Sequence, residues 1–266
     1  MELNLKLYFY LCIALLAGVI ALHSLPRLGK LGKSISESFC QAPGIDIVLA
    51  YFMLAPIAIG SLVSGWTGVG IALIAEVSVL WVWILAHEFA HRDQKQTGRI
   101  ARTMSGIFGS WRNHVAIWIT ALAIPVFWAV RFAELVVYPP LTKLIGLPKY
   151  QTEDWVNVSR HKFEGLVGYD LIWCLYCDWM TGVWSLGTEM LRNVESFWCP
   201  IRFYSDKKCE NCQQDFPDLD NGWVAANGTM EDVADVLQSK YDGENDSSWF
   251  GHPCRQQTTQ ESKTEV

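Results

Sequence analysis

The sequence predicts an α-helical polytopic membrane protein with about four apolar segments, followed by a mainly helical, cysteine-containing soluble domain. Long uncharged runs fill residues 1–146, and about 20 apolar residues suffice to cross a bilayer. The charge balance also changes there: residues 1–146 hold 11 Lys+Arg and 7 Asp+Glu, whereas residues 147–266 hold 10 and 20. We therefore expect a membrane domain over 1–146, an acidic aromatic- and Cys-rich domain over 147–254, and a disordered tail over 255–266.

The first predicted span covers residues 7–25, in a run without charged side chains. A signal peptide is the alternative. The preceding residues contain one lysine and no A-x-A-like cleavage site follows, which favours an uncleaved span.

The next apolar run begins at Ile47 and is too long for a single crossing. Gly65 and Gly68 near its middle favour a turn, so the sequence predicts two spans, 46–64 and 68–90. Glu76 lies within the second of them, where a carboxylate is costly and is a functional candidate by default. The alternative is a protonated Glu76 hydrogen-bonded to a neighbouring helix.

Residues 92–113 are predicted to form an interfacial basic helix. Four basic residues recur at helical spacing and share one face suited to anionic lipid headgroups: Arg92, Lys95, Arg99 and Arg102. An ordinary solvated loop is the alternative.

A fourth span is predicted over 115–137, with Arg131 extending to the far headgroups. Pro125 also permits a kinked or re-entrant segment. The 23–45 and 92–113 loops carry the short-loop Lys and Arg residues, which places both on the cytoplasmic side, with the exits of spans one and three at the same face. The side of the C-terminal domain depends on whether the fourth segment crosses.

The end of the third span carries the pentad His87-Glu88-Phe89-Ala90-His91. On a helix, residues four apart share a face, so both imidazoles can ligate one metal while Glu88 acts as general base. The pentad and its position resemble the membrane zinc metallopeptidases of the HExxH class. That resemblance implies a zinc hydrolase with a third ligand on a later helix, usually a Glu in an acidic motif. No such motif is present, although Glu164 and Glu189 hold suitable positions.

Histidines also gather at the predicted cytoplasmic interface. His23 leaves span one, His87 and His91 leave span three, and His114 enters span four. We expect a shared metal site with His87, His91 and His114 as ligands, since imidazoles with a carboxylate suit zinc or iron. Histidines that only anchor the interface are the alternative.

Six of the eight cysteines lie after residue 170. Cys209 and Cys212 form a C-x-x-C pair in a polar stretch, and Cys199 lies close enough in sequence to join them. These three are predicted to bind structural zinc or an iron–sulfur cluster, with disulfides as the alternative in an oxidising compartment. Cys174 and Cys177 lie in an apolar stretch, which favours packing.

Two functional hypotheses follow. The first is a membrane metalloenzyme built on His87, Glu88 and His91, hydrolytic with zinc and oxidative with iron. The second is a non-enzymatic membrane anchor or scaffold whose acidic, Cys-rich domain binds a structural metal and a protein partner. The lipid bilayer is a partner in both, and the acidic tail argues against nucleic acid.

Overall fold

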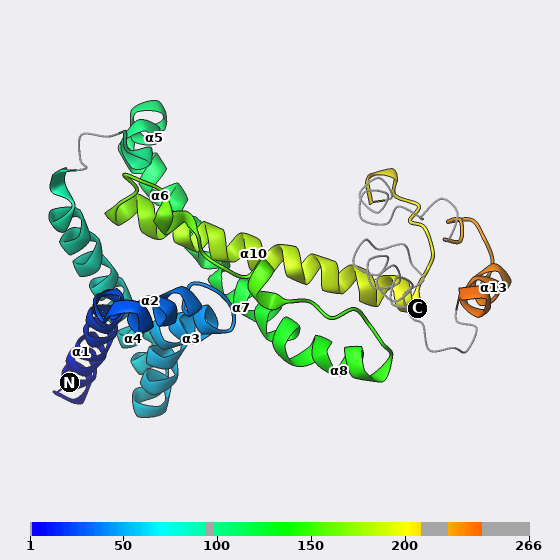
Figure 1. The fold of residues 1–266 in the computed structure, drawn as a ribbon, viewed down its shortest axis with the longest axis horizontal. Coiled ribbons are helices and arrows are strands. Elements are labelled where there is room, and N and C mark those ends of the chain that lie inside the picture. The colour runs from blue at the N-terminus through cyan, green and yellow to red at the C-terminus, as the bar shows by residue number, and fades with distance from the viewer. Residues whose placement is uncertain (1, 94–97, 209–222, 241–266) are drawn as a thin grey trace. The chain divides into compact units, whose positions relative to one another are not determined.

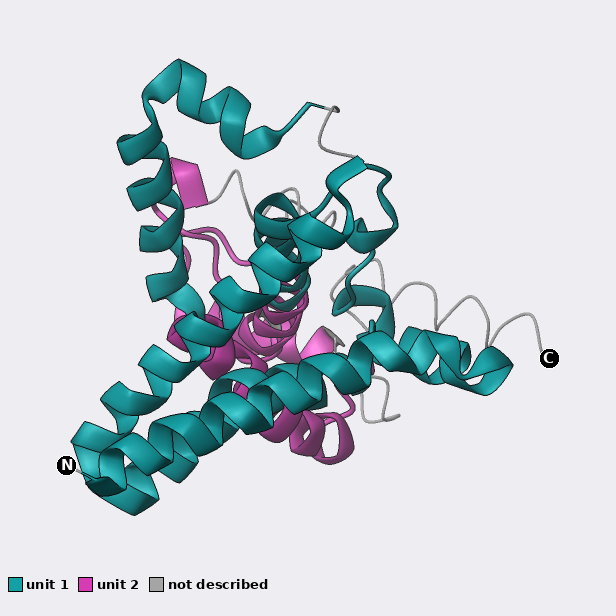
Figure 2. Cartoon of the chain, turned by 90° about the vertical axis from the view of Figure 1, so that its left-hand side faces the viewer, with its two compact units in different colours: residues 1–124, 152–183 teal, residues 125–151, 184–266 magenta. Residues whose placement is uncertain are grey.

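The computed structural model describes residues 2–93, 98–208 and 223–240, in which every named element is a helix (Figure 1). Extended pairing in these residues is limited to two isolated bridges, Gln41 with Asn157 and Ile201 with Val224. The chain forms two compact units, residues 1–124 with 152–183 and residues 125–151 with 184–266 (Figure 2). The domain boundary predicted at residue 146 rests on the change in amino-acid composition, and it stays a prediction.

Three helical stretches of the described chain are long and apolar enough to cross a membrane: Glu2–Arg27, Gly44–Ala90 and Ser110–Leu144. The first contains α1 (Glu2–Ser24) and the 3-10 turn η1 (Leu25–Arg27). The second contains α3 (Gly44–Leu49), the π-helical turn η2 (Ala50–Leu54) and α4 (Ala55–Ala90). The predicted helical class is therefore confirmed.

Helix α4 reverses direction inside its range. Ser64 (φ −141°, ψ 19°) and Gly65 (φ 57°, ψ −137°) leave helical geometry. Beyond them Gly68 returns against Gly60, so closely that a Cβ on either glycine would collide with the other's carbonyl group. Gly65 supplies the positive φ that L-residues avoid. The predicted segments 46–64 and 68–90 are therefore the two arms of one helical stretch, on either side of the reversal.

Helix α1 packs along the second arm of α4. Leu7 and Leu11 form a buried cluster with Ala72 and Ala75, and both alanines are fully buried. At the other end of the two helices, the Trp83 Nε1–H donates to His23 Nε2 at 2.8 Å. The C-terminal ends of α1 and of this arm therefore lie together, and the membrane face on which they lie stays a prediction.

The continuous basic helix predicted over 92–113 does not form. Arg99 is extended (φ −119°, ψ 127°), and α5 begins only at the next residue (Ile100–Phe108). Gly109, at φ 88°, then separates α5 from α6 (Ser110–Thr120). The interruption at Arg99 removes this residue from the predicted basic face, and Lys95 lies outside the described residues.

Helix α10 (Gly168–Trp198) begins in the first unit, which contains this helix up to Val183. Residues 40–42 pair with 156–158 through the Ala42 N–H to the Val156 carbonyl (2.8 Å) and the Val158 N–H to the Cys40 carbonyl (2.7 Å). Short helices flank these residues: α2 (Gly29–Ser38), α9 (Thr152–Trp155) and the 3-10 turn η6 (Arg160–Lys162).

The third span-length stretch continues from α6 through the 3-10 turn η4 (Ala121–Ala123), α7 (Ile124–Phe132), the π-helical turn η5 (Ala133–Val137) and α8 (Tyr138–Leu144). Within it, Arg131 does not extend to headgroups as predicted. Its side chain is fully buried and pairs with Glu134 at 2.7 Å, because a residue three positions along the helix supplies the opposite charge.

In the sequence, Thr229 followed by Glu231 and Asp232 is typical of a helix start, and α13 (Met230–Lys240) begins directly after Thr229. The Asp232 N–H donates to Thr229 Oγ1 at 3.3 Å, and the Thr229 N–H donates to Asp232 Oδ2 at 2.7 Å. This reciprocal cap satisfies two amides, and the hydrogen bond from the Thr229 backbone lowers the pKa of Asp232.

Candidate functional site

The His87–His91 pentad forms the last turn of the second α4 arm. The two imidazole rings are stacked, with centroids 4.2 Å apart, as residues four positions apart on a helix allow. The His23 ring, from the end of α1, lies with its centroid 6.2 Å from that of His87. The structure therefore brings His23, His87 and His91 together, whereas the cytoplasmic level predicted for these three and His114 stays a prediction.

Hydrogen bonds to these rings determine their tautomers. The Gly168 N–H donates to His87 Nδ1 at 3.2 Å, and the Trp83 Nε1–H donates to His23 Nε2. Both donors lack lone pairs, so each accepting nitrogen is unprotonated and the other nitrogen of that neutral ring carries the proton. His91 Nδ1 instead meets the His87 carbonyl oxygen at 2.9 Å and must donate to it. A lone pair thus stays available on His91 Nε2, whereas His87 would have to break its bond to Gly168 in order to ligate a metal.

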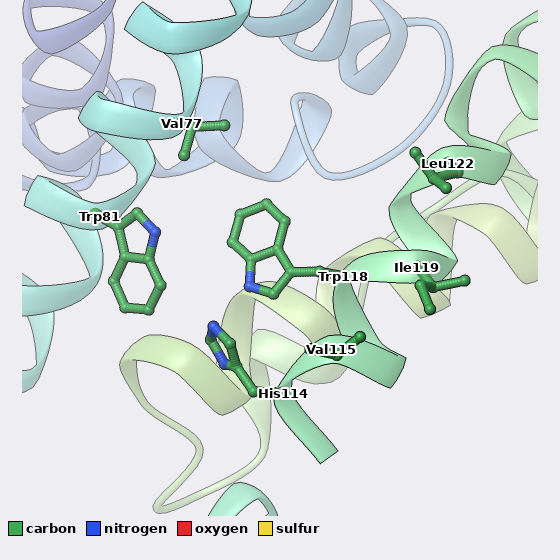
Figure 3. Close-up of a pocket in the computed structure, with 7 residues that line it drawn as sticks. All are labelled: Val77, Trp81, His114, Val115, Trp118, Ile119 and Leu122. Carbon is green, nitrogen blue, oxygen red and sulfur yellow. The ribbon is translucent and has the colours of Figure 1, made fainter. Parts of the chain in front are cut away.

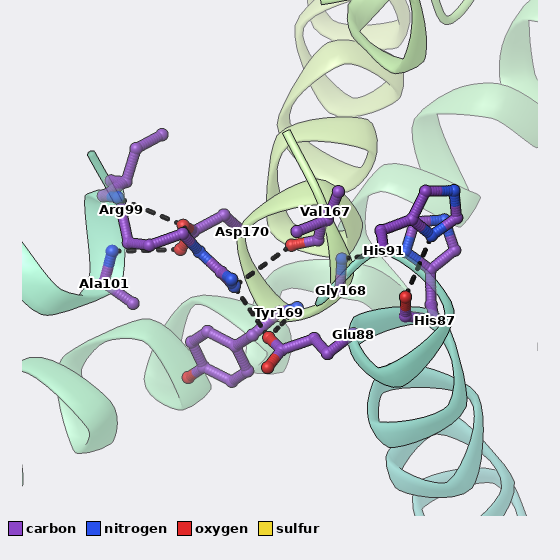
Figure 4. Close-up of polar contacts among 10 residues, drawn as sticks. His87, Glu88, His91, Arg99, Ala101, Val167, Gly168, Tyr169 and Asp170 are labelled. Atoms are coloured by element: carbon purple, nitrogen blue, oxygen red, sulfur yellow. Dashed lines mark hydrogen bonds and ion pairs between the residues drawn. The ribbon is translucent and has the colours of Figure 1, made fainter. Parts of the chain in front are cut away.

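Glu88 is held by an arginine. The Arg99 Nη2 lies 2.7 Å from Glu88 Oε1, and the Arg99 Nε lies 2.9 Å from Asp170 Oδ2 (Figure 4). The same Arg99 Nη2 donates to the Val167 carbonyl at 3.2 Å. The Arg99 side chain is 11% exposed and that of Asp170 is 4% exposed. Arg99 therefore bridges the end of α4 to the start of α10, and it is not placed to bind headgroups as predicted.

Asp170 also caps α5. Its Oδ2 accepts the Ile100 N–H at 3.1 Å and its Oδ1 accepts the Ala101 N–H at 2.9 Å. A carboxylate at this position satisfies two amides that lack partners within the helix and interacts favourably with the helix dipole. Burial acts to lower the pKa of Arg99, but its hydrogen bonds to Asp170 and Glu88 outweigh that effect and raise it.

Gly168 allows the two helix ends to approach. Its φ is +54°, and a Cβ at this position would collide with the Glu88 side chain. The Gly168 N–H is thereby directed to His87 while the Tyr169 N–H donates to Glu88 Oε1 at 3.3 Å. The pentad thus receives two backbone hydrogen bonds and one arginine from distant segments.

His114 lies in an aromatic group with Tyr169 and Trp81. Its Nδ1 is 3.0 Å from the Tyr169 hydroxyl, and its ring centroid is 6.0 Å from that of Trp81. Burial raises the pKa of the Tyr169 hydroxyl. The structure therefore brings His87 and His91 together but gives His114 other partners.

In the described residues, no group of three or more His, Cys, Asp or Glu side chains is arranged to hold a metal ion. Cys199 is an exposed free thiol, and Cys209 and Cys212 lie outside the described residues, so the thiolate site stays a prediction. Cys174 and Cys177 are half-buried free thiols on α10, and burial raises the pKa of Cys174, in agreement with a packing role.

One carboxylate oxygen of Glu76, Oε1, is buried without a hydrogen-bond partner among the described residues. The alternative of a protonated Glu76 hydrogen-bonded to a neighbouring helix requires an acceptor for the carboxyl proton, and it stays a prediction.

Asp170, Gly168 and Tyr169 are the functional residues that sequence reasoning missed. Asp170 lies 71 positions from Arg99, and no local spacing joins them. The available signal was the Gly168-Tyr169-Asp170 sequence at a helix start, where a glycine followed by an acidic residue is typical of a capped end.

Comparison of the chain with protein families, with characterised proteins and with solved structures finds no match.

Proposed function

We propose that this protein is a non-enzymatic multi-pass membrane anchor that holds the start of α10 against the end of α4. The observation that supports this proposal is the Arg99 bridge, in which one guanidinium joins Glu88 to Asp170 at 2.7 and 2.9 Å. An anchor needs a fixed junction between its membrane helices and the segment that it presents. Charge-assisted hydrogen bonds to a shared arginine provide such a junction.

The same contacts support a structural role for Glu88, because they engage its Oε1. In the HExxH mechanism the glutamate takes a proton from a metal-bound water, so an oxygen must face that water. Here Glu88 Oε1 already accepts from Arg99 and from the Tyr169 N–H. Glu88 therefore acts as a structural acceptor in this proposal.

The presented segment is acidic. Residues 147–266 hold 20 Asp+Glu and 10 Lys+Arg, so a partner protein with a basic surface would be attracted to it. A structural metal on Cys199, Cys209 and Cys212 belongs to this proposal, as does a cytoplasmic 92–113 loop, which the distribution of Lys and Arg favours.

The test compares Glu88→Gln with Glu88→Ala in the full-length protein in lipid nanodiscs. The readout is hydrogen exchange at residues 168–171. Glutamine retains an oxygen acceptor, so we expect exchange close to wild type, whereas alanine should speed it by about tenfold or more, as loss of a charged hydrogen bond implies. Glu37→Ala, on the exposed face of α2, is the control and should change nothing there. Unchanged exchange in Glu88→Ala would refute the anchoring role.

The membrane metalloenzyme is a second candidate, and a separate observation favours it. The rings of His23, His87 and His91 lie together at the C-terminal ends of α1 and α4, and His91 Nε2 keeps a lone pair. With zinc such a site would support hydrolysis, and with iron it would support oxidation.

Metal analysis of the purified protein separates the two candidates. The metalloenzyme predicts about one zinc or iron per chain that is lost in His91→Ala and retained in Cys199→Ser. A structural thiolate site predicts the reverse. Retention of metal in Glu88→Gln with loss of a hydrolytic activity would favour the enzyme over the anchor.

A further inference from the structure

A groove lies between the second arm of α4 and the helix α6. Its volume is about 550 Å³, within the range of ligand sites in proteins. Seven residues line it, and Figure 3 shows the Trp81 and Trp118 rings on opposite sides with His114 below them. The lining residues are Val77, Trp81, His114, Val115, Trp118, Ile119 and Leu122.

All of these residues belong to two of the span-length stretches, Gly44–Ala90 and Ser110–Leu144. Several are widely exposed, with Val77 at 40%, Ile119 at 59% and Leu122 at 77%. In water such a surface would be unfavourable, whereas in a bilayer an apolar chain can fill it and recover the dispersion contacts that a void loses. The expected occupant is therefore a hydrocarbon chain.

The polar end of the groove indicates which lipid carries that chain. Arg112, Val115 and Ile119 are three and four residues apart on α6, so they share one face, with Arg112 nearest the helix start. Arg112 is exposed, and it precedes the apolar lining by about one turn. His114 and the Tyr169 hydroxyl form a second polar pair at the same level.

We propose that this groove binds one acyl chain of an anionic phospholipid, with its phosphate on the Arg112 guanidinium. The charge of Arg112 complements the phosphate, and a planar guanidinium binds phosphate oxygens bidentately. The two tryptophans supply rigid apolar walls for the chain, as aromatic residues do near membrane interfaces. This site is independent of the anchoring role proposed for Glu88.

The test uses the full-length protein in phosphatidylcholine nanodiscs that contain a trace of phosphatidylglycerol with a diazirine on its acyl chain. After illumination, labelled peptides are identified by mass spectrometry. We expect labelling at residues 77–81 and 115–122 that excess unlabelled phosphatidylglycerol suppresses and excess phosphatidylcholine does not. Labelling that no competitor suppresses would show ordinary bilayer contact and overturn the proposal.

Two pairs of variants sharpen the test. Arg112→Gln should reduce the competable labelling by about tenfold, because it removes a charge-assisted contact, whereas Arg102→Gln removes an equal charge from the exposed face of α5 and should leave it unchanged. Val115→Phe fills the groove and should reduce labelling, whereas Val82→Phe alters an exposed valine of α4 outside the groove.

The remaining outcomes overturn the proposal. Equal effects of Arg112→Gln and Arg102→Gln would mean that the lipid is held by overall charge. Equal competition by both lipids would show a chain-binding groove without headgroup recognition. Self-crosslinking of two protein copies through residues 115–122, without lipid labelling, would identify a second copy as the occupant. Circular dichroism checks the fold of Val115→Phe, and Arg112→Gln tests the proposal independently because it alters an exposed residue.

Discussion

Arg131 and Arg99 both lie in short ion pairs, yet their partners lie at different distances along the chain. Arg131 pairs with Glu134 three residues later, at 2.7 Å, with both side chains almost completely buried. Arg99 pairs with Glu88 and Asp170, which lie on two other helices. The first pair neutralises two charges within one helical stretch. The second joins the end of α4, the start of α5 and the start of α10, so tertiary structure depends on it.

This difference predicts how each pair responds to mutation. A buried local pair can be replaced by apolar residues of similar volume at little cost, because both charges leave together. A shared arginine cannot be replaced in this way, because Asp170 also accepts the amides of Ile100 and Ala101. The following predictions test the comparison, from the largest effect to the smallest.

Arg99→Met should have the largest effect. It leaves Asp170, whose side chain is 4% exposed, without its cation, and breaking such a buried pair costs about 3–5 kcal/mol. The melting temperature of the purified protein in detergent should fall by roughly 10 °C. Arg102→Met alters an exposed arginine on α5 and should change stability by less than about 0.5 kcal/mol. Similar melting temperatures for the two variants would show that the bridge does not stabilise the junction.

Gly168→Ala should have an intermediate effect of roughly 1–3 kcal/mol, because alanine must adopt φ +54° and its Cβ would collide with Glu88. The control is Gly70→Ala, where nothing lies within 4 Å of the added Cβ. That change should stabilise the helix by about 0.5–1 kcal/mol. The measurement is the melting temperature, together with hydrogen exchange at residues 168–171. A neutral Gly168→Ala would mean that the close approach of α10 to α4 is not required.

The smallest effect is expected for the double variant Arg131→Met, Glu134→Leu. Each single change should cost about 3–5 kcal/mol, but the pair together should lie within about 1 kcal/mol of wild type. The matched double variant Arg99→Met, Asp170→Leu should not recover, because the two α5 amides lose their acceptors. Thermal unfolding of the wild type, the four single variants and the two double variants gives the coupling energies. Recovery in both doubles, or in neither, would remove the distinction between the local pair and the shared arginine.

Several features were determined by the sequence because neighbouring residues encode them. The apolar runs predicted span-length helices, the glycines predicted the reversal that occurs at Ser64 and Gly65, and Thr229 predicted the start of α13. The grouping of His23, His87 and His91 was also predictable, because each lies at the end of a span. Helical periodicity and chain breaks act over a few residues, so a single sequence is enough to locate them.

The tertiary structure alone decided the partners of the charged and polar side chains. Arg99 has the helical spacing of an exposed basic face, yet its backbone is extended and its half-buried side chain lies between Glu88 and Asp170. His114 has the position of a third metal ligand, yet it meets the Tyr169 hydroxyl. Spacing determines which residues share a helix face, but not which distant segment packs against that face. A buried charge takes the partner that the packing of helices brings within hydrogen-bond distance, and that choice depends on contacts about 70 residues apart.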